Sequence, residues 1–474
     1  MKIRVIGGGL AGPEAALTAA RFGCDVELYE MRDVVHGQLR GTPAHQTADF
    51  GELVCSNSLK SESPNTAPWL LKQEMRRAGS ALLRIADLTA VPAGHALAVD
   101  RVEFSRMIGE AIAAEPRIRV IRQEVTRLEP PTPNPSADPS EDHPSLTILA
   151  TGPLTSDALS QELAQLTGSE HLAFYDSISP IVDAETIDME RVYFAARWDK
   201  GTADYINCPM NREQYARFLD ALLTAEAAEA KQWERLEYFE GCLPIEILAR
   251  RGPETLRFGP MKPVGLRDPR TGQTPWAVVQ LRKENVRADS YNLVGFQNHL
   301  KFAEQARVLR LIPGLEHATF LRYGQIHRNT YLCAPAVLDE SLRLKQHPWL
   351  MVAGQLSGVE GYTESIATGL LAGLYAAQLS RGEEPRPVPR SCGLGSMIHA
   401  ITRAEIKRFQ PTNVTFDLLE PLDEEIRKKI RDKKERHRLQ CERALSAFDD
   451  WWAAAGCGPQ AHAPTCLPAP SPAF

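Results

Sequence analysis

The sequence lacks the features that would place it in a membrane or outside the cell. None of its apolar runs reaches the ~18 residues of a membrane-spanning helix, and its N-terminus lacks the basic and then apolar stretches of a secretory signal. Its nine cysteines are scattered without CxxC pairs, which argues against a disulfide framework and against a zinc site. We therefore expect a cytoplasmic protein with reduced thiols, no membrane association and no metal.

Positive charge is also scarce. The chain has 54 Lys and Arg residues against 60 Asp and Glu residues, a net charge of −6. This balance argues against bulk, non-specific affinity for nucleic acid, although a local basic face could still contact RNA. At 474 residues, 43% of them hydrophobic, the chain is long enough for two or three globular domains.

The first thirty residues carry the clearest pattern. Lys2 to Ile6 predict a strand, and Val26 to Tyr29 predict a second strand that closes at Glu30. Between them lie Gly7-Gly8-Gly9-Leu10-Ala11-Gly12 and a helical pattern from Pro13 to Phe22. A strand, a glycine turn, a helix, a second strand and an acid together form a dinucleotide-binding unit.

Each residue type in this unit has a physical reason. Gly7 makes the tight turn, Gly9 lets the backbone approach a pyrophosphate, and Gly12 lets the helix pack closely on the strand. The helix N-terminus attracts phosphate, and Glu30 can accept the hydroxyls of a ribose. A unit that begins at the third residue favours FAD over a transient nicotinamide. No second complete GxGxxG is present, so NADPH and NADH remain open as reductants.

Two helical stretches carry cations whose role the sequence leaves open. Residues 68–86 predict one helix with an apolar stripe, and four cations lie off that stripe: Lys72, Arg76, Arg77 and Arg84. Near the end of the chain, a helical pattern from 424 to 447 carries a second set: Arg427, Lys428, Lys429, Arg431, Lys433, Lys434, Arg436 and Arg438. Both sets predict solvated helix faces, and contact with phosphate is the alternative.

The later chain predicts a discontinuous domain. Six prolines between 129 and 145 predict a surface loop, and an apolar strand then ends at Thr151-Gly152. A second buried strand runs into Gly354, ahead of Gly358 and a helix from Glu364 to Ala377. We predict an α/β fold in which 1–172 and 324–450 form a Rossmann-type FAD-binding domain. Residues 173–323 would form an inserted mixed α/β domain, and 451–474 a disordered tail.

A set of longer motifs extends the opening turn along the chain. They are Leu28-Tyr29-Glu30-Met31-Arg32, Glu52-Leu53-Val54-Cys55-Ser56-Asn57-Ser58-Leu59, Ala96-Leu97-Ala98-Val99-Asp100-Arg101, Gly241-Cys242-Leu243-Pro244-Ile245-Glu246, Phe258-Gly259-Pro260-Met261-Lys262-Pro263-Val264-Gly265-Leu266, Gly295-Phe296-Gln297, His327-Arg328-Asn329-Thr330 and Gly358-Val359-Glu360-Gly361-Tyr362. In these motifs the chain resembles the TrmFO family of folate- and FAD-dependent tRNA (uracil-54-C5)-methyltransferases. The motifs occur in the family's order and cover about residues 1–440.

The resemblance implies a GidA-like fold and an unusual methylation. The family takes a one-carbon unit from 5,10-methylenetetrahydrofolate, and FAD reduced by NADPH or NADH supplies the electrons. The product is 5-methyluridine in the tRNA T-loop, so the expected partners are tRNA, folate and a nicotinamide, with no obligate protein partner. The expected FAD contacts are Gly7, Gly8, Gly9, Leu10, Ala11, Gly12, Glu30, Arg32, Thr151, Gly152, Gly354, Gly358 and Tyr362.

The chemistry requires two reactive groups. Uracil C5 becomes nucleophilic only after a group adds to C6, and a thiolate suits that addition; a second group must then remove the C5 proton. The family's two cysteines match Cys242, expected as the nucleophile, and Cys55, expected as the general acid/base, although the roles could be exchanged. Ser56-Asn57-Ser58 predict a helix cap that would favour a Cys55 thiolate.

Other side chains are candidates for the folate. His327 could stack on the pterin. Arg282, Lys283 and Lys301 could bind the folate glutamate or RNA phosphates.

Two alternatives remain open, and a third is disfavoured by length. The same chemistry could act on 23S rRNA, or the chain could be a flavoprotein that only oxidises NAD(P)H or folate. The related FAD protein of wobble-uridine modification is longer and carries an additional helical C-terminal domain, for which 474 residues leave no room.

Overall fold

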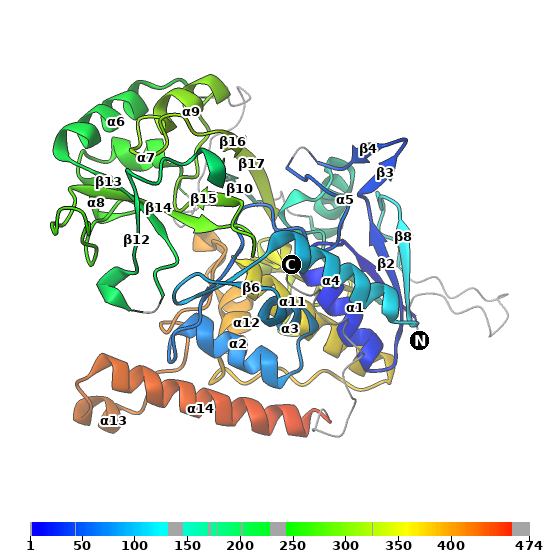
Figure 1. Cartoon of the computed structure of the whole chain (residues 1–474). Coiled ribbons are helices and arrows are strands. Elements are labelled where there is room, and N and C mark those ends of the chain that lie inside the picture. Colours follow the sequence, from blue (N-terminus) through cyan, green and yellow to red (C-terminus); the bar gives the residue numbers. More distant parts are fainter. Residues whose placement is uncertain are drawn as a thin grey trace.

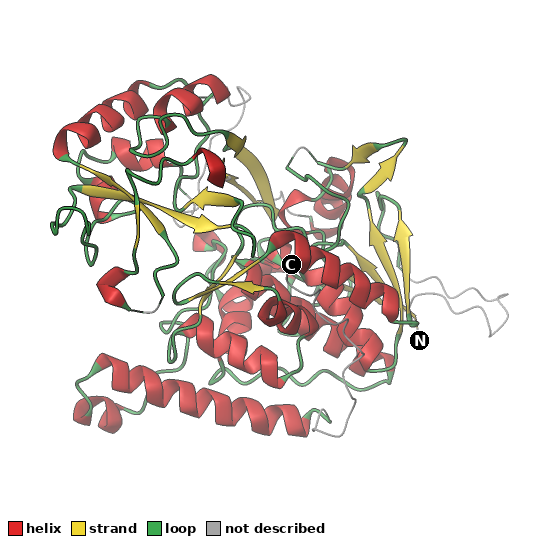
Figure 2. Cartoon of the chain, viewed as in Figure 1, coloured by secondary structure: helices red, strands yellow, loops and turns green. Residues whose placement is uncertain are grey.

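The computed structural model describes residues 2–42, 44–130, 146–168, 172–177, 179–200, 202–227, 243–324 and 326–456, with the backbone alone for 172–177, 326–329 and 408. Figures 1 and 2 show two α/β bodies that lie side by side. The larger body holds the N-terminus and most helices, and the smaller one lies at the upper left of Figure 1.

The larger body is built on a five-stranded sheet whose paired strands all run parallel. Its strands lie in the order β18 (Leu350–Val352), β9 (Leu146–Leu149), β1 (Lys2–Ile6), β2 (Asp25–Glu30) and β8 (Ile118–Arg122). All four residues of β9 are buried, as expected for a strand inside a parallel sheet that is covered on both faces.

The strand order fixes where a ligand can enter. β1 pairs with β2 on one side and with β9 on the other, so the connections diverge at its carboxyl end. In open α/β sheets, ligands bind at such a switch point. The loops that follow β1, β2, β9 and β18 meet here, although β18 lies more than 300 residues after β1.

Two helices pack closely beside this edge. α1 (Ala11–Arg21) contacts α11 (Tyr362–Ser380) along its length. A Cβ added at Gly373 would lie 2.5 Å from the Ala15 carbonyl oxygen, and one at Gly369 would lie 2.9 Å from the Ala11 Cα. These two glycines allow the backbones to approach, so both helices begin next to the same edge of the sheet.

The smaller body contains a six-stranded antiparallel sheet and its own core. The strand order is β12 (Tyr193–Phe194), β13 (Ile206–Met210), β14 (Ala277–Lys283), β15 (Ser290–Leu293), β11 (Ile181–Asp183) and β16 (Phe320–Arg322). It packs against α6 (Arg212–Thr224), α7 (Ile245–Arg250), α8 (Thr255–Phe258) and α9 (Phe302–Leu309). A two-stranded ribbon of β10 (Leu172–Ser177) and β17 (Ile326–Tyr331) joins the bodies.

The predicted fold class is therefore confirmed: a discontinuous parallel-sheet part encloses an inserted mixed α/β part. The core of the smaller body draws on residues 182–320, which supports our proposal that the inserted domain extends over 173–323. The larger core draws on residues from both ends of the chain.

The remaining elements complete the larger body. They are β3 (Asp33–Val35), β4 (Gln38–Arg40), β5 (Ser58–Ser61), α2 (Ala67–Arg77), α3 (Ala81–Leu88), β6 (Ala90–Val91), β7 (Ala96–Val99), α4 (Arg101–Ala114), α5 (Asp157–Thr167), α10 (Ala334–Val337), α12 (Gly393–Arg403), α13 (Glu424–Lys429) and α14 (Lys433–Ala454), with short 3-10 turns that include η3 (Arg197–Asp199) and η5 (Gln355–Ser357).

Three expectations about helices were wrong. Residues 68–86 form two helices, because Gly79 adopts φ +72° and the Ser80 side chain accepts from Leu83 N–H to start α3. Lys72 is not solvated: it is fully buried and donates to the Leu59 and Ser61 carbonyls.

The third correction concerns the expected tail. α14 continues to Ala454 because Trp451 is buried and donates to the Arg386 carbonyl at 3.0 Å. The rest of that tail, 457–474, and most of the proline-rich loop, 131–145, lie outside the described residues.

Candidate active site

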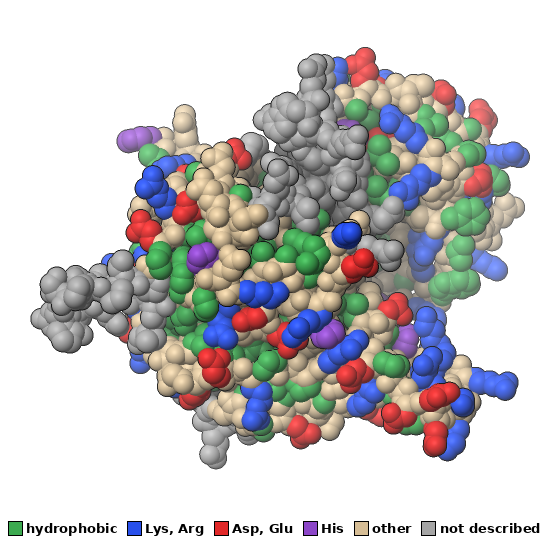
Figure 3. Space-filling model, turned by 180° about the vertical axis from the view of Figure 1, so that it is seen from behind, with side chains coloured by type: hydrophobic (Ala, Val, Ile, Leu, Met, Phe, Trp, Pro, Cys, Tyr) green, Lys and Arg blue, Asp and Glu red, His purple; other side chains and the backbone are tan. Residues whose placement is uncertain are grey.

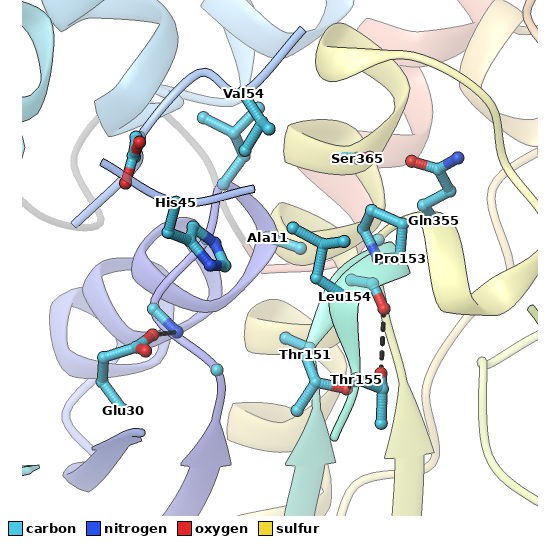
Figure 4. Close-up of a pocket in the computed structure, with 18 of the residues that line it drawn as sticks. Ala11, Glu30, His45, Val54, Thr151, Pro153, Leu154, Thr155, Gln355 and Ser365 are labelled. Atoms are coloured by element: carbon cyan, nitrogen blue, oxygen red, sulfur yellow. Dashed lines mark hydrogen bonds between the residues drawn. The ribbon is translucent and has the colours of Figure 1, made fainter. Parts of the chain in front are cut away.

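A cavity opens at the carboxyl edge of the parallel sheet. Its described wall comes from the glycine turn, the end of β2, the Cys55 segment, the loop after β9 and the start of α11. Figure 4 shows Glu30 on one side of this space, Thr151 and Thr155 on another, and Val54 and Gln355 around it. These five segments, which extend from the first residues of the chain to α11, thus form one site.

The glycine turn has the sterics that its sequence predicts. Gly7 adopts φ +116°, and a Cβ there would lie 2.6 Å from the Ala150 carbonyl carbon. A Cβ on Gly12 would lie 2.9 Å from the Gly7 carbonyl carbon, so α1 packs tightly on the turn. Gly9 lines the cavity, and a Cβ there would meet no atom within 4 Å. The backbone at Gly9 is therefore open to a bound group.

Two helices point their N-termini at this cavity. α1 begins after Leu10 and α11 begins after Gly361, and neither helix has a side-chain cap. Both cap residues line the cavity. Uncapped helix N-termini offer free N–H groups and partial positive charge, which favour an anion such as a diphosphate.

Glu30 and Arg32 form a buried clamp at the end of β2. Glu30 accepts from Gly8 N–H at 2.5 Å and from the Arg32 backbone N–H and guanidinium at 2.8 and 3.0 Å. Burial raises the Glu30 pKa most strongly of any single cause, but the Arg32 charge and the hydrogen bonds from Arg32 and Gly8 together outweigh burial and lower the pKa. Arg32 also reaches Glu52 at 3.2 Å. Glu30 is thus held as an anion facing the turn, and Arg32 acts mainly by holding it.

The Cys55 segment forms another part of the wall. Tyr362, the first residue of α11, accepts at its hydroxyl from Cys55 N–H at 2.8 Å and from Ser56 N–H at 3.2 Å. The predicted helix cap after Cys55 is wrong, because the segment enters strand β5 instead. Guanidinium groups supply positive charge here: Arg322 donates to the Val54 carbonyl at 3.2 Å and Arg101 to the Cys55 carbonyl at 3.5 Å.

The remaining expected cofactor residues are distributed unevenly. Thr151, Gly152 and Gly354 line the cavity, and the Thr151 hydroxyl bonds to Thr155 at 2.6 Å (Figure 4). Gly12 and Gly358 are not on the described wall. Gly358 has φ +90° and packs under the Phe409 ring, where a Cβ would lie 3.1 Å from Cε1.

The structure does not describe the side chains of two expected site residues, Cys242 and His327. Cys242 lies outside the described residues, and for His327 only the backbone is described, in β17 opposite Asp176. The described chain resumes at Leu243, and Ile245 N–H donates to the Gln297 carbonyl at 2.8 Å. Gln297 lines the cavity, so α7 is anchored to the cavity wall.

Several residues of the cavity wall were not predicted from the sequence as site residues. Gln297, Gln355, Lys60 and His45 line the cavity. Gln297 and Gln355 each end a strand–glycine stretch, and that shared pattern was the available signal. Arg101 is the last residue of the Ala96–Arg101 motif, but its contact with Cys55 joins residues 46 positions apart.

These features fit a dinucleotide such as FAD. The open backbone at Gly9 and the two uncapped helices suit a diphosphate, and the Glu30 carboxylate suits a ribose. Among the described residues, no group of three or more His, Cys, Asp or Glu side chains could hold a metal ion. None of the helices in the described part of the chain has the length and apolarity needed to cross a membrane.

Comparison with known proteins agrees with this fold and this site. The family model of glucose inhibited division protein A matches residues 2–384. The chain is 65% identical to the methylenetetrahydrofolate–tRNA-(uracil-5-)-methyltransferase TrmFO of Koribacter versatilis, over 96% of this chain and 98% of that protein. The chain belongs to the TrmFO family. TrmFO proteins of Solibacter usitatus and Enterococcus faecalis are 58% and 50% identical to it, over 95% and 94% of this chain and 98% and 97% of those proteins.

Solved structures support the fold beyond the TrmFO family. GidA of Aquifex aeolicus aligns with a TM-score of 0.67 at 16% identity, over 97% of this chain and 77% of that one. At this identity the likeness establishes the GidA-like fold alone. The chain accounts for about three quarters of the GidA chain, in line with the expected difference in length.

Proposed function

We propose that this protein transfers a one-carbon unit from 5,10-methylenetetrahydrofolate to C5 of uridine 54 in the tRNA T-loop, giving 5-methyluridine. The observation that carries the proposal is that Cys55 lies on the wall of the cavity formed by the glycine turn. Uracil methylation from a folate needs both nucleophilic and redox chemistry. A thiol beside a dinucleotide site can supply both. Membership of the TrmFO family supports the same activity.

The chain's own residues would first hold the cofactor. Gly9 and the N-termini of α1 and α11 would contact the diphosphate of FAD, and Glu30 would contact the ribose. When bound and reduced by NADPH or NADH, FAD supplies the electron pair that turns the methylene group into methyl.

The two cysteines would then act on the uracil ring. The Cys242 thiolate adds to C6, which places negative charge on C5 and lets C5 attack the one-carbon unit. Cys55 removes the proton from C5. Loss of that proton would break the bond between the transferred carbon and the folate nitrogen, so that tetrahydrofolate leaves and a methylene group remains on C5. A hydride supplied by the reduced cofactor would convert this methylene to methyl as the Cys242 sulfur leaves C6 and the C5–C6 double bond re-forms. Tyr362 and Arg101 hold the backbone of Cys55 on the cavity wall.

Cysteine variants test the proposal directly. Cys242→Ala and Cys55→Ala should each abolish methyl transfer to a tRNA transcript while the purified protein keeps its flavin. Cys333→Ala is the control, because Cys333 is not on the described cavity wall. Methyl transfer that survives in Cys242→Ala would refute the thiolate mechanism. A protein that oxidises NAD(P)H but never labels tRNA from methylenetetrahydrofolate would instead be a flavin oxidoreductase.

The RNA target has its own test. Sequencing RNA from a deletion strain should show loss of 5-methyluridine at position 54 of tRNA. Loss from 23S rRNA with tRNA unaffected would favour the alternative target. Since tRNA, folate and nicotinamide are cytoplasmic, we propose the same location for the enzyme.

The folate contacts remain proposals. His327 is retained as the candidate for stacking on the pterin. Arg282 is the better candidate for the folate glutamate, because its side chain is buried to 8% exposure in β14. Lys301 pairs with Glu226 at 2.7 Å on the surface.

The basic run at the C-terminus is a candidate contact for the tRNA backbone. Its cations lie on α13, on α14 and, for Arg431, in the short segment between them, and two of them are paired: Lys428 with Glu424 and Arg438 with Glu435. Within the described part of the chain, six others form no ion pair: Arg427, Lys429, Arg431, Lys433, Lys434 and Arg436. Unpaired cations on one edge match the charge of an RNA backbone.

A further inference from the structure

An exposed apolar surface lies on the inserted domain, away from the residues assigned above. Trp198 in η3 is 64% exposed, Phe258 at the end of α8 is 81% exposed, and Val264 is 52% exposed. We call these three residues the aromatic platform. Single exposed apolar residues are ordinary, but a group of large ones marks an interaction site. Figure 3 shows hydrophobic side chains beside Lys and Arg side chains along the edge of the inserted domain at the right of that view.

The platform joins two chain segments. Trp198 N–H donates to the Gly265 carbonyl at 2.7 Å, and the Arg197 guanidinium donates to the Val264 carbonyl at 2.7 Å. The indole lies against Gly265, which has φ +80°, and a Cβ there would be 2.8 Å from the ring. Glycine at 265 therefore makes room for the indole.

The backbone at Trp198 is strained. Trp198 has φ +60° and ψ 23°, and Asp199 follows with φ +51°. Such conformations cost about 1–3 kcal/mol for residues other than glycine, and they cluster at functional sites. Burial of the indole would offset that cost, but this indole is mostly exposed. The local structure thus holds an aromatic ring in solvent at a conformational cost.

Three cations lie close to the platform residues in the chain. Lys200, Lys262 and Arg267 are exposed, and none of them forms an ion pair among the described residues. Asp199 is the acid next to Trp198 in the chain, whereas Asp204 is buried and accepts from Gly94 N–H at 2.9 Å. Aromatic faces flanked by uncompensated cations are the chemistry that binds unstacked nucleobases and their phosphates.

The turn that carries part of the platform packs against the segment that leads to the cavity wall. Pro260, in the turn that carries Phe258 and Val264, lies against Gly295, where an added Cβ would be 2.9 Å from the Pro260 Cβ. Two residues later, Gln297 lines the cavity. One short segment thus connects the turn that carries Phe258 and Val264 to the cavity in which the target base would be held.

We propose that the aromatic platform stacks an unstacked base of the tRNA loop that carries the target uridine, while Lys200, Lys262 and Arg267 contact its phosphates. This inference rests on the proposed function. It assigns a role to the 258–266 motif, which the methylation chemistry leaves without one.

The test is tRNA affinity, measured with the flavin-loaded enzyme and an unmodified tRNA transcript at fixed salt. Trp198→Ala should raise Kd by about 5- to 150-fold, which corresponds to ~1–3 kcal/mol of stacking on one base. Trp198→Phe, which keeps an aromatic face, should recover most of the affinity. The KM for tRNA should rise more than kcat falls. Lys262→Gln with Arg267→Gln should lower the salt dependence of binding by ~0.7–0.9 for each lost phosphate contact.

Two controls distinguish failure of the platform proposal from misfolding and from failure of the proposed function. Met189→Ala removes another exposed apolar side chain of the inserted domain, 46% exposed, and should leave Kd within about twofold. Flavin content and thermal midpoint should show that Trp198→Ala folds. If wild-type enzyme methylates tRNA and Trp198→Ala binds tRNA equally well, the platform proposal is wrong. A change in oligomeric state without a change in tRNA affinity would overturn it in favour of self-association. Failure of the wild type to bind or methylate tRNA would instead refute the proposed function.

Discussion

The close approach of α1 and α11 makes the sharpest test of how this fold positions its cofactor. Gly369 lies in α11, and a Cβ there would sit 2.9 Å from the Cα and carbonyl carbon of Ala11, and nearer still to the carbonyl oxygen. These atoms are backbone at the start of α1, so they cannot rotate away. We predict that Gly369→Ala forces the two helices apart at the edge of the cavity.

A matched variant sets the scale of the effect. Gly109 is also a helical glycine, in α4, but a Cβ there would meet no atom within 4 Å. Replacing glycine by alanine within a helix gains ~0.8–1 kcal/mol from propensity alone, so Gly109→Ala should be neutral or stabilising. Gly369→Ala has the same gain, but overpacking costs ~1–3 kcal/mol. The two variants should therefore differ in free energy of unfolding by about 1–3 kcal/mol.

The measurement combines stability with cofactor binding. Thermal unfolding followed by circular dichroism should place Gly369→Ala below Gly109→Ala, by ~2–4 °C for each kcal/mol. Flavin fluorescence should show earlier release from Gly369→Ala, because the N-termini of α1 and α11 both face the cavity. Equal stability and equal flavin retention in the two variants would show that the helix contact does not shape the site.

Three further predictions concern other parts of the molecule. Tyr362→Phe leaves two backbone N–H groups of the Cys55 segment without an acceptor; it should cost about 1–3 kcal/mol and slow methyl transfer with flavin retained, and an unchanged rate would contradict this. Burial raises the pKa of Glu74 to about 8, although hydrogen bonds from two N–H groups of α12 lower this pKa in part. Protonated Glu74 therefore contributes its full stabilisation of the fold below pH 4.5, the ordinary pKa of the group. This contribution is lost as the pH rises from 4.5 through 8. Urea titrations between pH 4.5 and 8 should show that the free energy of unfolding of the wild type falls by up to ~1.4 kcal/mol per pH unit relative to that of Glu74→Gln. Parallel dependence of the two free energies on pH would argue against this role of Glu74. Replacing Arg427, Arg431 and Lys434 together by Gln should weaken tRNA binding and lower its salt dependence, whereas Arg438→Gln, at a paired cation, should change little; equal effects would remove the basic run from the interface.

Local sequence determined the parts of the site that consecutive residues build. The glycine turn could be predicted because its steric demands act between neighbours: Gly7 needs a positive φ, and Gly12 packs against the Gly7 carbonyl. Glu30 follows from the same unit, because a strand of fixed length carries it back to Gly8. The end of the predicted helix at Gly79 was missed, because the apolar stripe continued past it.

Only the tertiary structure decided how distant segments meet. Cys55 is held by Tyr362 across 307 positions rather than by a helix of its own, and no local pattern encodes that bond. Lys72 looks like a surface cation but is buried, because β5 offers it backbone carbonyls to bind. Trp198 is held in solvent by a strained turn and by its contact with Gly265, 67 positions further along the chain. In each case the deciding contact joins residues far apart in the chain, so chain topology and packing determined it.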